Sequence, residues 1–214
     1  MWQACTVRAT TEPLLVLPQP QITVWALPLG RTCKAERRAE SQRLLLGLLA
    51  AALDCEPASL ELTRAPGGKP ELSGSGLHFN LSHSGALACV AISPLVPVGV
   101  DIEQQRRLDR AAAIARRVCS PAELSHLGLD SSTTGPELTP ALLRLWVRKE
   151  AVVKASGEGI GRDLKTVDVL DEIVADGAGS KWRCLNLPAP ASGYLGALAY
   201  ESGYRVQATG PQRA

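Results

Sequence analysis

The sequence predicts an α+β protein, with antiparallel strands in sheets and helices packed against them. Two observations support this class: short alternating or apolar runs typical of strands occur in both halves of the chain, and segments with helical periodicity separate them. The order is strand, helix and strands, followed by strand, helices and strands. The halves therefore share a similar plan, and we expect two units, residues 1–97 and 98–214.

The first unit begins with an apolar, β-branched run that predicts a strand over 21–29. A helix is predicted over 34–54, with basic residues in its first half and apolar residues in its second. A short strand and the Gly/Pro-rich loop "GGKP" (67–70) follow. Residues 77–92 predict two strands that meet at the polar turn "SHSG" (82–85).

The second unit opens with a strand over 98–103, and apolar spacing predicts a helix within 107–120. Another helix begins at Ser120, with Pro121 and Glu123 completing an N-terminal capping pattern. A loop over 131–140 leads to a long apolar helix over 141–157. The remaining strands are predicted over 164–170, 181–187, 193–200 and 204–209.

Bulk composition excludes several classes of protein. The chain has 214 residues, 45% hydrophobic and 21% charged, with a net charge of +2, which is ordinary globular composition and too weakly basic for a nucleic-acid binder. Prolines interrupt the apolar stretch 13–29, so no membrane helix is expected. Six scattered cysteines without a C-x-x-C pair favour reduced thiols in a cytoplasmic protein over a zinc site.

The strand "VGVDIE" (98–103) carries two carboxylates in an unusual setting. Side chains alternate across a strand, so Asp101 and Glu103 share one face while Val98, Val100 and Ile102 share the other. A solvent-facing strand alternates in the same way without any function. Taken alone, this strand therefore leaves both interpretations open.

The long helix places Glu150 and Lys154 one turn apart on an otherwise apolar element. A surface ion pair is the ordinary explanation and contributes little to stability. A carboxylate and an ammonium beside so much apolar surface nevertheless need partners, which favours a functional site.

The segment "NLSHS" (80–84) contains a histidine, His83, after a predicted strand. Such a histidine either satisfies a turn or serves in phosphate binding or proton transfer.

Three carboxylates on rigid elements, Asp101, Glu103 and Glu150, repel one another unless a cation neutralises them. Oxygen ligands without thiolate or imidazole suit Mg²⁺, which completes its coordination with phosphate oxygens. Lys154, His83, Lys69 and the basic start of the first helix supply counter-charge. A magnesium-bridged pyrophosphate site follows as a hypothesis.

The ordered motifs "GGKP", "FNLSHS", "VGVDIE" and "LWVRKEAVVKASGEGI" together resemble the signature of the Sfp-type 4'-phosphopantetheinyl transferases. Each motif is short and weakly specific, whereas the ordered set is highly specific. The resemblance implies a pseudo-dimer of two similar α+β halves, with the site at their interface. It also implies a monomer that takes coenzyme A as co-substrate, uses Mg²⁺, and binds no nucleic acid or membrane.

The resemblance assigns roles to individual positions. It implies Mg²⁺ ligands at Asp101, Glu103 and Glu150. It implies contacts to coenzyme A at Arg43, Lys69, Ser82, His83, Asp101 and Lys154. His83 and Arg43 would lie near the 3'-phosphate, and the match at Arg37 and Arg38 is looser.

Glu123 is the position where the chain departs from the family pattern. Many relatives have a phenylalanine in the turn before this glutamate, whereas the sequence here reads "RRVCSPAE". Ser120 and Glu123 form a complete capping box, so Glu123 is a helix cap, a catalytic group, or both.

The implied reaction moves the phosphopantetheine arm from coenzyme A to a serine of an acyl or peptidyl carrier protein of fatty-acid, polyketide or nonribosomal-peptide synthesis. Lys154 would stabilise the leaving oxygen, and Glu150 or Glu123 would take the serine proton. The rival hypotheses are a non-catalytic coenzyme A or nucleotide binding module and a structural interaction protein. Magnesium-dependent binding of coenzyme A would separate the last from the other two.

Overall fold

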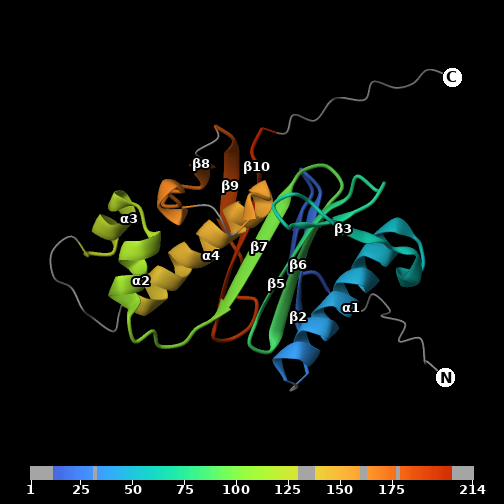
Figure 1. Cartoon of the computed structure of the whole chain (residues 1–214), viewed down its shortest axis with the longest axis horizontal. Helices are drawn as coiled ribbons and strands as arrows, with labels where there is room; N and C mark the ends of the chain where they lie inside the picture. The colour runs from blue at the N-terminus through green and yellow to red at the C-terminus, as the bar shows by residue number, and fades with distance from the viewer. Residues whose placement is uncertain (1–11, 31–32, 130–137, 160–162, 177–178, 204–214) are drawn as a thin grey trace.

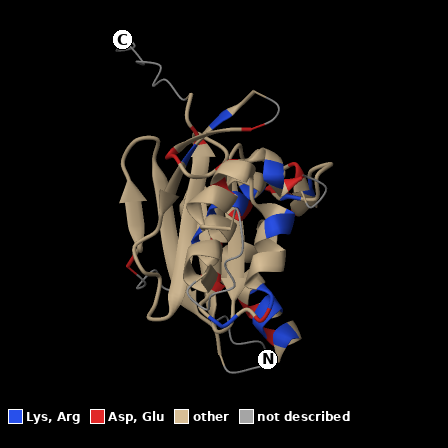
Figure 2. Cartoon of the chain, turned by 90° about the vertical axis from the view of Figure 1, so that its left-hand side faces the viewer, with Lys and Arg blue, Asp and Glu red and all other residues tan. Residues whose placement is uncertain are grey.

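The computed structural model describes residues 12–30, 33–129, 138–159, 163–176 and 179–203. The chain forms two four-stranded antiparallel sheets and one small two-stranded sheet, with helices packed beside them. In Figure 1 helix α4 (Leu138–Ser156) crosses in front of strand β7 (Val98–Gln104), and in Figure 2 the helices gather on one side of the strands. The mixed α and β content agrees with the predicted class.

The first half of the chain builds a sheet with strand order β1-β2-β6-β5. Its strands are β1 (Leu15–Leu17), β2 (Ile22–Pro28), β5 (His78–Ser84) and β6 (Leu87–Ser93). Helix α1 (Lys34–Leu53), the 3₁₀ turn η1 (Pro57–Ser59) and the hairpin of β3 (Leu62–Arg64) and β4 (Pro70–Leu72) separate β2 from β5.

The second half builds a sheet with strand order β7-β10-β9-β8. Its later strands are β8 (Ile173–Ala175), β9 (Lys181–Asn186) and β10 (Tyr194–Glu201). Helices α2 (Ala111–Val118), α3 (Pro121–His126) and α4, followed by the 3₁₀ turn η3 (Leu164–Thr166), connect β7 to β8. Among the residues described, no helix is long and apolar enough to cross a membrane.

Three hydrophobic clusters hold these layers together. One lies between α1 and the first sheet, one between the second sheet and helices α2 and α4, and one joins β2 and β6 to β7 and β10. Strand β6 is buried along its whole length because Ala88, Val90 and Ile92 belong to the first of these, while Cys89 and Ala91 belong to the last. Burial on both faces explains why its sequence is continuously apolar.

Side chains of β5 join the two sheets along one edge of β7. The backbone N–H groups of Val100, Ile102 and Gln104 donate to Asn80 Oδ1 (2.9 Å), Ser82 Oγ (3.3 Å) and Ser84 Oγ (3.1 Å) respectively. The three acceptors alternate along β5, so they share one face. One edge of β7 pairs with β10, and these three side chains accept from the N–H groups on its other edge. Without acceptors, those buried N–H groups would destabilise the fold. We call this contact the seam.

Helix α4 lies directly against the face of β7 that carries Gly99. A Cβ on Gly99 would lie 2.1 Å from the Ala151 carbonyl oxygen and 2.3 Å from the Ala155 amide nitrogen, so any side chain there would separate the two elements. This close approach brings α4 over Asp101 and Glu103, which point from the same face of β7 as Gly99. The alternation in "VGVDIE" is therefore that of a strand buried on both sides rather than one facing solvent.

Several element predictions need correction. The "SHSG" segment is not a turn, because β5 continues to Ser84 and the hairpin turn follows at Gly85–Ala86. Residues 164–170 are not a strand: side chains bind their backbone groups, with Glu123 accepting from Val169 N–H and Lys149 donating to the Leu164 carbonyl. The short strands β1, β4 and β8 were not predicted, and α4 begins at Leu138 within the predicted loop. The predicted strand over 204–209 lies outside the described residues.

The remaining predicted elements are confirmed. Helix α1 spans 34–53 against the predicted 34–54, and α3 begins after a Ser120 cap. Among the cysteines described, all are free thiols; Cys89, Cys119 and Cys184 are buried, and Cys33 and Cys55 are exposed.

Replacing Asn80 with alanine tests the seam. The Val100 N–H would then be buried without an acceptor, so we expect the free energy of unfolding to fall by about 1–3 kcal/mol in urea denaturation. Gln42→Ala, at an exposed position of α1, is the control and should change it by less than about 0.5 kcal/mol. Equal losses in the two variants would show that the seam contributes nothing.

Candidate active site

A pocket of about 320 Å³ lies where β5, β7 and α4 meet beside the seam. It gathers most of the predicted site residues; its lining is Leu81, Ser82, His83, Asp101, Ile102, Glu103, Trp146, Glu150 and Lys154. Strands supply one wall and a helix the other, so the polar groups are held on rigid elements.

Asp101 is the buried centre of this pocket. Its Oδ1 lies 2.6 Å from Lys154 Nζ and 2.7 Å from the Ser82 Oγ that donates to it. Its Oδ2 is buried and, among the described residues, has no hydrogen-bond partner. Burial raises the pKa of Asp101, an effect that Lys154 and Ser82 only partly offset. The carboxyl group therefore keeps one acceptor oxygen that no described residue satisfies.

Glu150 faces Asp101 from α4, one turn before Lys154. Burial raises the pKa of Glu150 most, and the nearby carboxylate of Asp101 raises it further, while Lys154 opposes the shift. A raised pKa makes this carboxylate a stronger proton acceptor than an exposed glutamate. Glu150 and Lys154 therefore line the same pocket and interact electrostatically, as the sequence predicted.

Glu103 lies at the outer rim of the pocket. Its Oε2 accepts a hydrogen bond from Ser84 Oγ (2.8 Å) and pairs with Arg106 Nη1 (3.0 Å). Arg106 is more than half exposed, so this pair is an open surface contact that contributes little energy.

The three predicted metal-binding carboxylates do not form a closed ligand set as placed. Within the described part of the chain, no group of three or more His, Cys, Asp or Glu side chains is arranged to hold a metal ion. Asp101 and Glu103 share a face of β7, and Glu150 interacts electrostatically with both. The magnesium site therefore stays a prediction.

His83 lies at the end of the pocket nearest the basic start of α1. Burial lowers its pKa most, and Lys154, Arg38, Lys34 and Arg37 lower it further. Cations from two elements thus gather around one imidazole, which is the charge pattern of an anion site. Sequence reasoning named Arg37 and Arg38 only loosely and missed Lys34, although all belong to the basic first turns of the helix.

Arg43 is exposed on α1 and is not part of the pocket lining. It also does not belong to the group of cations that perturb His83. Its predicted contact with coenzyme A stays a prediction, and the cations nearer to His83 are more direct candidates.

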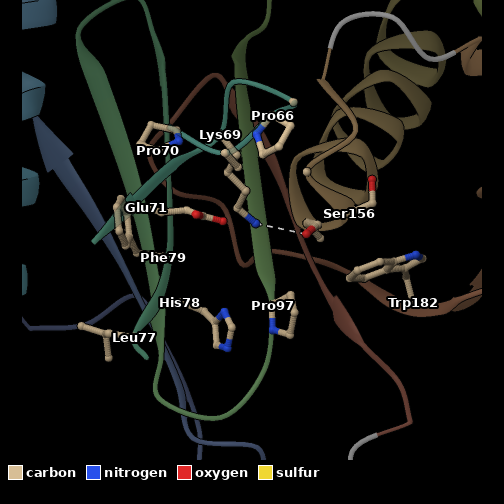
Figure 3. A pocket seen from close by; sticks show the side chains of 14 residues that line it. Pro66, Lys69, Pro70, Glu71, Leu77, His78, Phe79, Pro97, Ser156 and Trp182 are labelled. Atoms are coloured by element: carbon tan, nitrogen blue, oxygen red, sulfur yellow. Dashed lines mark hydrogen bonds between the residues drawn. The ribbon is translucent and has the colours of Figure 1, made fainter. Parts of the chain in front are cut away.

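Lys69 lies in a different pocket, of about 420 Å³, at the opposite end of β5 (Figure 3). Its ammonium donates to the carbonyl oxygens of Val98 (2.9 Å) and Ala155 (3.1 Å). The structure therefore does not group Lys69 with the other predicted phosphate contacts, and its predicted role with coenzyme A is not tested.

Glu123 is fully buried and caps α3. Its Oε2 lies 2.6 Å from Lys149 Nζ and 2.8 Å from Ser120 N–H, and its Oε1 accepts from Val169 N–H at 2.9 Å. The capping box predicted from the sequence is confirmed. Glu123 does not line the pocket that contains Asp101, so its predicted catalytic role gains no support from the geometry.

Lys149, the residue before Glu150, is a buried charged residue that the sequence analysis did not single out. Its side chain is completely buried, pairs with Glu123, and also donates to the carbonyls of Leu164 and Val167. The signal was available, because a lysine within an apolar helix requires a buried partner. Lys149 thereby ties α4 to α3 and to residues 164–167 at the position next to Glu150.

Comparisons with known proteins agree with this geometry. The family described as the 4'-phosphopantetheinyl transferase superfamily matches residues 97–196. A Synechocystis protein provisionally named a 4'-phosphopantetheinyl transferase is 31% identical over 206 residues, covering 81% of each chain. The transferase HetI of Nostoc is 28% identical, covering 70% of this chain and 74% of its own. Sfp of Bacillus subtilis is 34% identical over 92 residues, covering 43% of this chain and 38% of its own.

Variants of the Glu123–Lys149 pair separate structure from catalysis. Lys149→Met leaves the Glu123 carboxylate buried without its cation, so we expect a loss of about 3–5 kcal/mol in the free energy of unfolding. Glu123→Gln keeps the cap but leaves the Lys149 ammonium unpaired, and should also destabilise the fold. The double variant should recover much of this loss.

The matched control for this pair is Arg183→Met, which breaks the exposed Arg183–Glu172 ion pair and should cost less than about 1 kcal/mol. A stable Glu123→Gln variant that has lost turnover would instead support a catalytic role for Glu123.

Proposed function

Since this chain belongs to the 4'-phosphopantetheinyl transferase superfamily, we propose that it transfers the phosphopantetheine arm of coenzyme A to a serine of an apo carrier protein. The products are the holo carrier protein and adenosine 3',5'-bisphosphate. The observation that carries the proposal is the single pocket in which Ser82, Asp101, Glu150 and Lys154 converge.

We further propose that the chain is a pseudo-dimer of two halves, 1–97 and 98–214, with the site between them. The support is the shared strand order: β2 pairs with β6 and β6 with β5, and likewise β7 pairs with β10 and β10 with β9. In each half, the strand that comes first in the chain, β2 or β7, is followed by helical structure. The strand that comes last in the chain, β6 or β10, lies between the other two in the sheet. We also propose that the protein is a cytoplasmic monomer that binds neither nucleic acid nor membrane.

The residues of the pocket fit a hard divalent cation. Among the described residues, Asp101 Oδ2 is a buried oxygen without a hydrogen-bond partner. The pKa of Glu150 is raised chiefly by burial, and the nearby carboxylates of Asp101 and Glu103 raise it further. Oxygen donors of this kind suit Mg²⁺. Asp101, Glu103 and Glu150 would hold it, and when bound it would offset the charge of the pyrophosphate.

Glu150 is the proposed general base. The serine hydroxyl of the carrier gives its proton to the Glu150 carboxylate, directly or through one water, as its oxygen attacks the phosphorus that bears the pantetheine arm. The raised pKa of Glu150 suits this step. Glu123, with both carboxylate oxygens already bonded in the interior, is the weaker candidate.

Lys154 is the proposed stabiliser of the leaving group. As the new serine O–P bond forms, the bond between that phosphorus and the bridging pyrophosphate oxygen breaks, and the electron pair remains on adenosine 3',5'-bisphosphate. The Lys154 ammonium already reaches Asp101 and Ser82 Oγ (3.1 Å), so it is placed to donate to this oxygen or the adjacent phosphate oxygens. Positioning and charge stabilisation supply most of the catalysis in such reactions.

The 3'-phosphate end of coenzyme A is proposed to lie near His83 and α1. The cations that lower the pKa of His83 come from the first turns of this helix, and Arg43 extends the basic series along it. Ser82 adds a hydroxyl close to the pyrophosphate position. An acidic carrier protein would meet the same positively charged end of the molecule.

A non-catalytic coenzyme A binding module is the second candidate. It would retain the basic groups but has no need for a buried Asp101–Lys154 pair beside a glutamate of raised pKa. The presence of both disfavours it.

Neutral isosteres of the carboxylates test the activity. Asp101→Asn, Glu103→Gln and Glu150→Gln should each reduce transfer to a panel of apo carriers by roughly a hundredfold or more, measured by mass spectrometry with coenzyme A and Mg²⁺. Glu61→Gln, at an exposed position, is the matched control and should keep full activity. If Mg²⁺ raises the melting temperature of the wild type but not of the three variants, the metal assignment gains support without any turnover measurement.

Binding measurements test the assignment of the 3'-phosphate. His83→Ala, Arg38→Ala and Arg43→Ala should each weaken coenzyme A binding by roughly tenfold while changing dephospho-coenzyme A binding much less, because only the former carries the 3'-phosphate. Isothermal titration with both ligands measures the difference. A variant that weakens both ligands equally has its side chain elsewhere on the molecule.

A further inference from the structure

The GGKP loop meets the end of α4 backbone to backbone. A Cβ on Gly67 would lie 1.8 Å from the Gly157 carbonyl oxygen, and a Cβ on Gly159 would lie 2.4 Å from the Gly67 carbonyl oxygen. Glycine at both positions therefore lets two loops touch that are about ninety residues apart in the sequence. These glycines belong to the two motifs "GGKP" and "ASGEG" that the phosphate chemistry leaves unexplained.

Lys69 completes this contact with its side chain. Its ammonium donates to the Val98 carbonyl at the start of β7 and to the Ala155 carbonyl in the last turn of α4. The last four carbonyls of a helix lack partners within the helix, and a cation there also interacts favourably with the helix dipole. Figure 3 shows the lysine extended across the pocket toward the end of α4.

The two elements that Lys69 joins are those that carry the reacting groups. Strand β7 holds Asp101, and α4 holds Glu150 and Lys154. The Lys154–Asp101 distance of 2.6 Å depends on how α4 lies along β7. Gly99 permits the close approach of the two elements at Ala151 and Ala155, and Lys69 is placed to fix that approach at the same C-terminal turns of the helix.

We propose that Lys69 is a positioning residue, which together with Gly67 clamps the end of α4 to β7 and so holds Glu150 and Lys154 over Asp101. This assignment rests on the proposed transferase function and replaces a phosphate contact for Lys69. The side chain acts through two backbone carbonyls and touches neither coenzyme A nor the reacting atoms.

The ionisation of Lys69 gives the clamp a signature that does not depend on activity. Burial lowers its pKa to about 8, against the opposing attraction of Glu71. Glu71 and His78 are the titratable groups that face it, while α4 and β7 present backbone carbonyls. The pKa of His78 is itself lowered, so this imidazole stays neutral above pH 8.

The direction of the pH effect follows from proton linkage. Between about pH 8 and the unfolded-chain pKa of about 10.4, the unfolded state binds more protons at Lys69 than the folded state does. The contribution of Lys69 to stability therefore increases as the pH rises through this window. A lysine that extends into solvent to meet a phosphate has an ordinary pKa and shows no such increase.

The test compares Lys69→Met and Lys69→Arg with Lys181→Met, an exposed lysine on β9. Lys69→Met should lower kcat by roughly tenfold to a hundredfold, while the Kd of coenzyme A stays within about twofold. Lys69→Arg should restore much of kcat, because arginine can also donate to two carbonyls. The stability advantage of the wild type over Lys69→Met should grow between pH 8 and pH 10, and its advantage over Lys181→Met should stay constant.

Gly67→Ala offers an independent variant in case Lys69→Met does not fold. It should reproduce the loss of kcat with unchanged coenzyme A binding, whereas Gly203→Ala, which has open space for a Cβ, should not. A raised Kd for coenzyme A with normal stability in Lys69→Met would overturn the clamp and return Lys69 to the phosphate site. If the wild type modifies no carrier, the proposed function fails, and the loss of stability in Lys69→Met and in Gly67→Ala, relative to Lys181→Met and Gly203→Ala, still decides whether the clamp exists.

Discussion

The seam between β5 and β7 is the contact on which the rest of the molecule depends. Two antiparallel sheets meet here without backbone pairing, because Asn80, Ser82 and Ser84 accept from the free edge of β7. Ser82 performs two tasks with one hydroxyl: it accepts from Ile102 N–H and donates to Asp101 Oδ1. The group that joins the sheets therefore also orients the central carboxylate of the pocket. Structure and site share atoms at this position.

Three contacts place the C-terminal half of α4. Lys149 pairs with Glu123, Gly99 allows β7 to approach Ala151 and Ala155 closely, and Lys69 donates to the Ala155 and Val98 carbonyls. None of these contacts belongs to the reacting groups. They nevertheless hold the helix that brings Glu150 and Lys154 to Asp101. Lys149 and Lys154 lie in a largely apolar helix because each has a carboxylate partner, Glu123 and Asp101 respectively.

Local patterns predicted most of the fold, and they failed where partners come from distant parts of the chain. Alternating or continuously apolar runs identified the strands from 78 to 104, and the Ser120 capping box identified the start of α3. The segment 164–170 has the composition of a strand, but Glu123 and Lys149 bind its backbone groups, and no local pattern reveals that. Within the site, Asp101, Ser82, His83, Glu150 and Lys154 were predicted and lie together, whereas Lys69 points to a different pocket. The sequence could identify a conspicuous lysine in a loop, but not which carbonyls it would reach.

The charge balance of the pocket links its architecture to its chemistry. Asp101 and Glu150 have raised pKa values chiefly because both are buried, and Lys154 only partly opposes the shifts. One ammonium therefore faces these two carboxylates, while Glu103 pairs with the exposed Arg106. Such an arrangement costs folding free energy unless further positive charge enters. An anionic pyrophosphate alone would add to the repulsion, whereas a divalent cation that enters with it would relieve it. The surplus of carboxylate over ammonium among Asp101, Glu150 and Lys154 is therefore the physical argument for the proposed binding of a metal together with coenzyme A.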